Sequence, residues 1–135
     1  MRSAPSRYRW PILGAIVLVA SATAIAMTWS SQQQSQAVAR AMTGGEPSRA
    51  PDIIRRYGCA GCHTIPGIPG GDGQVGGPLT NIKHRVYVGG VVPNSPDNLV
   101  RWIVSPQTFS PRSAMPATGI SEADARHVAS FLYAQ

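Results

Sequence analysis

The chain has 135 residues, of which 12 are Lys or Arg and 6 are Asp or Glu, giving a formal net charge of +6. This length suits one domain with appendages. The sequence pI is about 10.2. From residue 46 onward, however, the chain has eight basic and six acidic residues, so the high pI gives no reason to expect nucleic acid as a partner. The 14 Gly and 12 Pro residues predict a loop-rich fold that a bound cofactor could organise.

The N-terminal part predicts a membrane segment. Residues 1–9 are short, polar and basic, and an almost wholly apolar run follows at residues 12–27. Trp10 and Trp29 bracket this run. As a helix, residues 10–29 would span roughly 28 Å, close to the hydrocarbon thickness of a bilayer. The tryptophan belt and the basic N-terminus predict a single-pass anchor in the inner membrane, with residues 1–9 in the cytoplasm.

A cleaved signal peptide is the alternative for this segment. Ala-x-Ala sequences, which have the form of a cleavage site, occur at residues 22–24 and 24–26. Cleavage would leave a soluble periplasmic protein. The apolar run is longer than that of a usual signal peptide, which favours retention of the anchor. Both alternatives export the rest of the chain.

Residues 30–45 are predicted to be a linker, with residues 46–135 as the domain that follows it. The first part of the linker is rich in Ser and Gln, without apolar periodicity and with no core to join. Residues 37–42 could extend a helix outward until Gly44 and Gly45 stop it. The expected function of this segment is spacing alone.

The motif that organises the domain follows a short predicted helix at residues 48–57, with Ser48 as its cap and Pro51 in its first turn. Cys59, Cys62 and His63 form C-x-x-C-H, the attachment sequence for c-type haem. Two thiols at this spacing can each form a thioether to one haem vinyl group. The next residue is then held under the iron as its proximal ligand.

Other interpretations of the two cysteines lack their context. A thioredoxin-type pair would need a βαβ pattern around it, and the sequence shows none. Half of a zinc site would need further ligands, and only His84 and His127 remain, far apart in the sequence. A structural disulfide is the third alternative. The motif favours haem over all three.

Loops and two further helices are predicted after the motif. Residues 64–77 read as a Gly/Pro loop, and the glycines at 71, 73 and 76 lack the strand and helix of a dinucleotide site. We expect them to let the backbone approach the haem edge. Helices are predicted at residues 95–104, capped by Ser95, and from Ser121 to the end. A proline-marked loop between these helices contains Met115.

The order of helix, C-x-x-C-H, Gly/Pro loop, helix, Met-Pro loop and last helix resembles that of class I cytochromes c, over about residues 46–135. The small membrane-anchored monohaem type of bacteria is the most similar group. The motifs that carry the resemblance are Tyr-Gly-Cys-Ala-Gly-Cys-His-Thr from residue 57, Gly-Gly-Pro-Leu from 76, Asn-Leu-Val-Arg-Trp-Ile from 98 and Ala-Met-Pro-x-x-Gly from 114. The resemblance implies an all-α fold of three to four short helices around one haem.

Site residues follow from the resemblance. It implies one haem c attached through Cys59 and Cys62, with His63 and Met115 as the two iron ligands. His84 is the other residue that could compete with Met115 for the sixth position. A carbonyl at Gly77 or Pro78 would orient the proximal imidazole. Three more positions match family landmarks: Trp102 as an aromatic near Met115, and Val128 and Phe131 where the last helix packs on the first. A propionate contact is expected at Tyr87.

Two functions from different classes are consistent with this site. The first is an electron carrier without catalytic activity, which exchanges electrons with a quinol–cytochrome c oxidoreductase, a terminal oxidase or a dehydrogenase on the periplasmic side. A variant of it is an electron-entry subunit held inside such a complex. The second is a haem protein with an open distal site that binds small molecules. The sequence favours the carrier, because His and Met together leave iron no free position.

Overall fold

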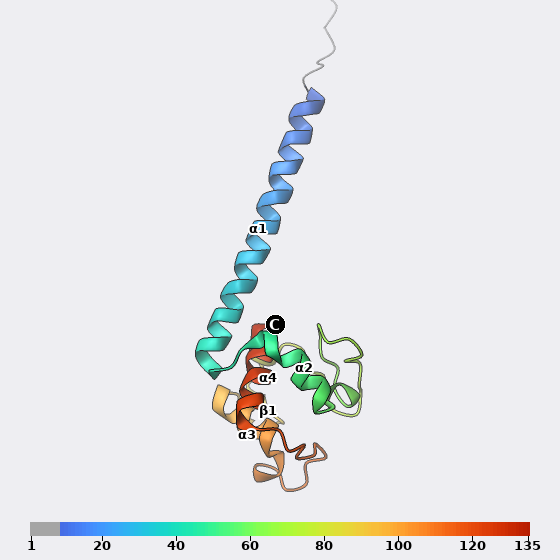
Figure 1. Ribbon diagram of the computed structural model, residues 1–135, viewed down its shortest axis with the longest axis vertical. Helices are drawn as coiled ribbons and strands as arrows, with labels where there is room; N and C mark the ends of the chain where they lie inside the picture. Colours follow the sequence, from blue (N-terminus) through green and yellow to red (C-terminus); the bar gives the residue numbers. More distant parts are fainter. Residues whose placement is uncertain (1–8) are drawn as a thin grey trace, which may run out of the picture. The chain divides into compact units, whose positions relative to one another are not determined.

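The computed structural model describes residues 9–135, so the basic segment predicted at residues 1–9 lies outside the described residues except for Arg9. The chain divides into two compact units, one ending at Gln34 and the other comprising Ser35–Gln135. Helix α1 (Arg9–Thr43) makes up the described part of the first unit and enters the second (Figure 1).

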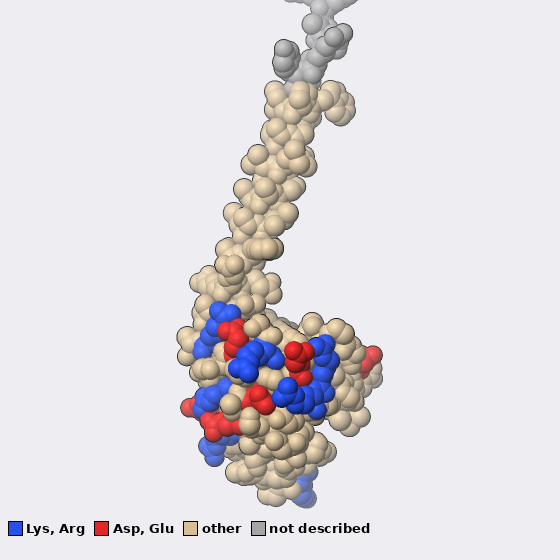
Figure 2. All heavy atoms as spheres, viewed as in Figure 1, with Lys and Arg blue, Asp and Glu red and all other residues tan. Residues whose placement is uncertain are grey.

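The first unit is a helix with apolar side chains on all faces. No residue from 10 to 39 is charged, and this stretch of α1 carries no Lys, Arg, Asp or Glu in Figure 2. Its most apolar window has a mean hydropathy of 2.0 and is not buried within the protein. The few hydroxyl groups bond back to the helix, as Ser21 does with the carbonyl of Val17 at 2.8 Å. Its length and composition fit a single-pass membrane helix or a signal segment.

The predicted linker is helical, not irregular. α1 continues through the Ser/Gln-rich stretch because Ser, Gln, Ala and Arg are acceptable in helices and no Gly or Pro interrupts them. Its last turns do join a core, since Ala39 and Thr43 are buried. Gly44, with φ +69°, then ends the helix as predicted, and its N–H donates to the carbonyl of Arg40 at 2.8 Å.

The next helix begins differently from the prediction. A 3₁₀ turn, η1 (Pro47–Arg49), precedes α2 (Ala50–Arg56). Ser48 caps neither, because it lies within η1. The carboxylate of Glu46 caps η1 instead, and it also accepts from the Ser48 hydroxyl at 3.2 Å. Pro51 occupies the first turn of α2, as expected.

The two later helices begin where the sequence predicts. Ser95 caps α3 (Pro96–Val104), its hydroxyl accepting from the Asn98 N–H at 3.2 Å. Ser121 caps α4 (Glu122–Ala134) in the same way, accepting from the Asp124 N–H at 3.1 Å. The short remaining elements are η2 (Cys59–Gly61), η3 (Ile82–His84), η4 (Pro106–Thr108) and an antiparallel pair, β1 (Tyr87–Val88) and β2 (Val92–Pro93).

α4 is the centre of the second unit. It packs against α2, α3 and η1 (Figure 1). Its residue Val128 is buried, and Phe131 lies at the edge of the core. The last helix thus packs on α2, the first helix of the predicted domain. Buried apolar residues of α2, α3 and α4 form one core. Charges of both signs are interspersed on the face of this unit seen in Figure 2. The chain is mostly helical, as predicted.

Candidate cofactor site

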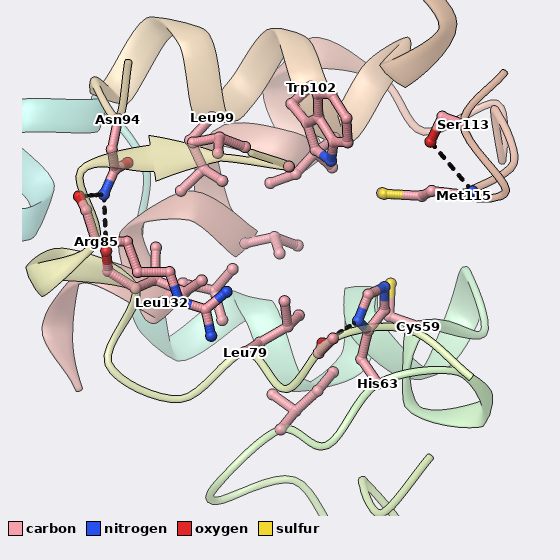
Figure 3. A pocket seen from close by; sticks show the side chains of 18 of the residues that line it. Cys59, His63, Leu79, Arg85, Asn94, Leu99, Trp102, Ser113, Met115 and Leu132 are labelled. Carbon is pink, nitrogen blue, oxygen red and sulfur yellow. Dashed lines mark hydrogen bonds between the residues drawn. The ribbon is translucent and has the colours of Figure 1, made fainter. Parts of the chain in front are cut away.

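An apolar cavity of about 320 Å³ lies in the second unit. This volume is within the usual range for a small-molecule or cofactor site. The cavity is walled by aliphatic side chains from α2, α3, α4 and the loops between them: Ile54, Ile65, Leu79, Ile82, Val88, Leu99, Ile103, Val128 and Leu132. Its polar groups are few: His63, Arg85, Tyr87, Asn94 and Ser113. Figure 3 shows several of these side chains around the central space.

The C-x-x-C-H segment forms one wall of this cavity. Gly58, with φ +72°, turns the chain out of α2, and the next turn is closed by the His63 N–H, which donates to the carbonyl of Cys59 at 3.0 Å. The turn brings Cys59 and His63 to the cavity. Burial raises the pKa of the Cys59 thiol above its ordinary value, so the neutral thiol is favoured there.

The His63 imidazole has a fixed orientation. Its Nδ1 lies 2.6 Å from the carbonyl oxygen of Gly77, so Nδ1 carries the proton and donates it. Nε2 is thereby left as the basic nitrogen, the arrangement found in metal-ligating histidines. Of the two carbonyls considered from the sequence, Gly77 and Pro78, the Gly77 carbonyl is the one in contact with the ring (Figure 3).

The Gly-rich loop packs closely on this segment. A Cβ at Gly76 would lie 2.4 Å from Cε1 of His63, and one at Gly73 would lie 2.6 Å from the carbonyl carbon of Cys62. At these distances a side chain at either position would force its neighbours to shift. The glycines therefore bring the backbone against the histidine ring and the motif.

Met115 and Trp102 line the same cavity as His63. In Figure 3 the thioether of Met115 points into the space between Trp102 and His63. Trp102 stacks on Phe109, with ring centroids 6.2 Å apart, and its ring faces Gly89, where a Cβ would lie 2.2 Å away. The Trp102 ring therefore lies on the same cavity as Met115.

The remaining predicted site residues lie around or outside the cavity. Tyr87 lines it and is 54% exposed. Neither Cys62 nor Pro78 lines it, and the carbonyl of Pro78 accepts a hydrogen bond from Arg85. His84 is exposed and lines a different surface pocket. Among residues 9–135, no three His, Cys, Asp or Glu side chains come together as a metal site.

Three polar cavity residues, Arg85, Asn94 and Ser113, were not predicted as site residues. The guanidinium of Arg85 donates to the carbonyl of Thr80 at 3.1 Å, and this side chain lines the cavity. Asn94 donates to the carbonyls of Ile82 and Arg85 at 2.7 and 2.9 Å and accepts from the Tyr133 hydroxyl at 2.6 Å. Nothing in the local sequence distinguishes Asn94 from an ordinary turn residue.

Comparison with known proteins gives one informative similarity. Cytochrome c oxidase subunit 2 of Alkalihalophilus pseudofirmus is 33% identical to this chain over 82 residues, which are 59% of this chain and 23% of that protein. The chain thus spans less than a quarter of the length of this relative. No protein-family model matches the chain, and no solved structure matches it. The chain is therefore similar to part of a subunit of a redox enzyme.

The residues of the cavity fit a covalently attached haem. Its walls are apolar, as a porphyrin requires, and an imidazole with a free Nε2 and a thioether both enter it. A thiol lies at its edge in Cys59, with Cys62 three residues further along. The close approach of Gly76 to His63 keeps the imidazole in place without a side chain in between. This donor set is one that iron accepts in c-type haem proteins.

Proposed function

We propose that this protein is a membrane-anchored cytochrome that holds one haem c and carries single electrons between respiratory partners on the periplasmic side. Cys59 and Cys62 would attach the haem, and His63 and Met115 would ligate its iron. The haem supplies a one-electron redox centre. The chain's own residues bind it, orient the imidazole through Gly77 and exclude water from it. In this role the protein is a carrier and not an enzyme.

One observation carries the proposal: the imidazole of His63 and the thioether of Met115 enter the same apolar cavity. The sequence separates them by 52 positions, and the fold brings them together. An iron with both ligands has no position left for a substrate. The residues that line the cavity include one His and no Asp or Glu, so they offer no carboxylate–imidazole pair for acid–base chemistry.

The anchor determines where the protein would act. We propose that α1 crosses the inner membrane with its basic N-terminus in the cytoplasm, following the positive-inside rule. The second unit would then face the periplasm. Its near balance of charges, eight basic against six acidic residues, favours no strongly charged partner. A quinol–cytochrome c oxidoreductase, a terminal oxidase and a dehydrogenase all remain suitable partners.

A second candidate function is an electron-entry subunit within an oxidase complex. The observation that favours it is the similarity to cytochrome c oxidase subunit 2. The same haem site would serve, but the acceptor would be a permanent neighbour. Solubilisation of the membranes followed by affinity purification distinguishes the two: a free carrier purifies alone, and a subunit brings the other chains of an oxidase with it.

Carbon monoxide binding to the reduced protein tests the site. The unsubstituted protein should bind carbon monoxide poorly, because Met115 occupies the sixth position, and Met115→Ala should bind it readily. Met42→Ala is the matched control, since Met42 lies on α1 outside this cavity. Rapid stoichiometric binding by the unsubstituted protein would favour an open distal site and overturn the proposal of a carrier.

A further inference from the structure

Met115 lies in a short segment, residues 114–120, that lacks backbone hydrogen bonds of its own within the described chain. Within residues 9–135, no backbone–backbone hydrogen bond involves residues 114–120. These residues also lie outside all helices and strands. A methionine side chain is unbranched and flexible, so the position of its sulfur depends on what holds the backbone at residue 115.

Two side chains hold that backbone. Nε2 of Gln107 lies 2.6 Å from the carbonyl oxygen of Met115 and 3.5 Å from that of Ser113. The Oγ atom of Ser113 accepts a hydrogen bond of 3.3 Å from the Met115 N–H (Figure 3). Both polar groups of the Met115 backbone are therefore bound, the carbonyl by Gln107 and the amide by Ser113.

Gln107 is itself firmly placed. It lies in η4 (Pro106–Thr108), where Pro106 is fully buried. The hydroxyls of Ser105 and Thr108 bond to each other across this turn at 2.9 Å. The next residue, Phe109, stacks on Trp102, which lines the cavity. The amide of Gln107 thus ties the flexible Met115 loop to a packed part of the fold.

We propose that Gln107 is a positioning residue that keeps the Met115 thioether in the cavity. The inference rests on the proposed function, because the ligand role of Met115 belongs to it. Gln107 contacts only the backbone of the loop and is not a ligand. Its side chain has two amide donors, which match the two carbonyl oxygens of Ser113 and Met115. Loss of these bonds frees the loop and favours departure of the thioether.

Displacement of Met115 by added imidazole tests this inference in the full-length oxidised haem protein. The weak charge-transfer band of a Met–Fe(III) bond reports the ligand directly. For Gln107→Ala we expect imidazole to abolish this band at about fivefold lower concentration than in the unsubstituted protein, as the loss of the short hydrogen bond to the Met115 carbonyl implies. Gln107→Glu should have a larger effect, since it places a carboxylate against two carbonyl oxygens.

The control is Gln135→Ala. Gln135 also donates from Nε2 to a backbone carbonyl, that of Pro66 at 3.1 Å, but it does not contact the Met115 loop. The Gln135→Ala protein should lose the charge-transfer band at the same imidazole concentration as the unsubstituted protein. The inference is overturned if Gln107→Ala responds like the unsubstituted protein, or if Gln135→Ala weakens the band equally.

Failure of the proposed function gives a different result. A charge-transfer band that is absent from the unsubstituted protein, or that survives in Met115→Ala, would overturn the ligand assignment and the inference together. The inference alone would be overturned by a different pair of results. The band would be lost in Met115→Ala, and the unsubstituted protein and Gln107→Ala would lose it at the same imidazole concentration.

Discussion

The backbone of Gly76 lies directly against the imidazole of His63, so that a Cβ at residue 76 would be 2.4 Å from Cε1 and 2.6 Å from Nδ1 of the ring. The next residue, Gly77, accepts the hydrogen bond from Nδ1. One loop therefore sets both the position of the ring, through contact, and its tautomer, through the carbonyl.

Gly76→Ala should displace the His63 ring and weaken its bond to Gly77. We expect a loss of about 1–3 kcal/mol in the free energy of unfolding of the haem protein, the usual cost of overpacking. Urea denaturation measures this loss, and the NMR resonance of the Nδ1 proton reports the hydrogen bond. Gly77→Ala is the matched control, because a Cβ there meets nothing within 4 Å. Equal effects of the two substitutions would contradict the packing argument.

Tyr133 should make the fold sensitive to alkaline pH. Burial raises the pKa of Tyr133 to about 12, so the folded protein keeps the hydroxyl proton at pH values where the unfolded chain loses it. The contribution of Tyr133 to the free energy of unfolding should then be constant below about pH 10 and fall between about pH 10 and 12. Unfolding by urea across this range measures the fall, which should be smaller in Tyr133→Phe.

The same substitution should also destabilise the protein at neutral pH. In Tyr133→Phe, Oδ1 of Asn94 loses the donor that lies 2.6 Å away, at an expected cost of about 1–3 kcal/mol. Tyr87→Phe is the control, since Tyr87 is 54% exposed and should change the stability little. Equal stability of Tyr133→Phe and the unsubstituted protein at pH 7 would contradict the assigned role of this hydroxyl.

An ion pair at the end of α1 should show in the titration of Glu46. The guanidinium of Arg40 donates to Oε1 of Glu46 at 2.7 Å and lowers the pKa of this carboxyl below its usual value. The resulting stabilisation is present above the ordinary pKa and is lost as the pH falls through the lowered one. Arg40→Gln should raise the pKa of Glu46 in an NMR titration. Arg56→Gln is the control, because it removes an exposed cation elsewhere and should leave the pKa of Glu46 unchanged. An unaltered titration in Arg40→Gln would refute the pairing in solution.

We expect the mature protein to keep its N-terminal helix. α1 runs without interruption across both Ala-x-Ala sequences to Thr43, and its apolar window is long enough to cross a bilayer. After cell fractionation the protein should be found in the membrane, with an intact mass that includes the first helix. Recovery from the soluble periplasmic fraction, with a chain that begins at Ile25 or Met27, would show that the anchor is removed.

The features predicted correctly from the sequence are mostly local. Ser95 and Ser121 cap their helices because a cap needs only a hydroxyl and the N–H two or three residues further along. Gly44 ends α1 for an equally local reason. Ser48 failed as a cap because Glu46, with a longer acceptor side chain, took the N-terminal position of the 3₁₀ turn. Competition between two neighbouring acceptors is not visible in a pattern.

The features missed depend on distant contacts. Residues 35–43 were assigned to a linker because nothing in their sequence announces that Ala39 and Thr43 are buried in the second unit. The cavity residues Arg85 and Asn94 were missed for the same reason, since their partners are backbone carbonyls exposed by the loop conformation. The choice between Gly77 and Pro78 likewise required the fold, because the two carbonyls are adjacent in sequence and differ only in direction.

The central claim is that one haem is bound covalently through Cys59 and Cys62. Intact-mass measurement of the denatured protein purified from a host that attaches c-type haem tests it most directly, because only a covalently bound haem survives denaturation. We predict the mass of the polypeptide plus one haem, and the mass of the polypeptide alone for the double substitution of Cys59 and Cys62 by Ala. An unsubstituted protein with the mass of the polypeptide alone and two free thiols would contradict the account.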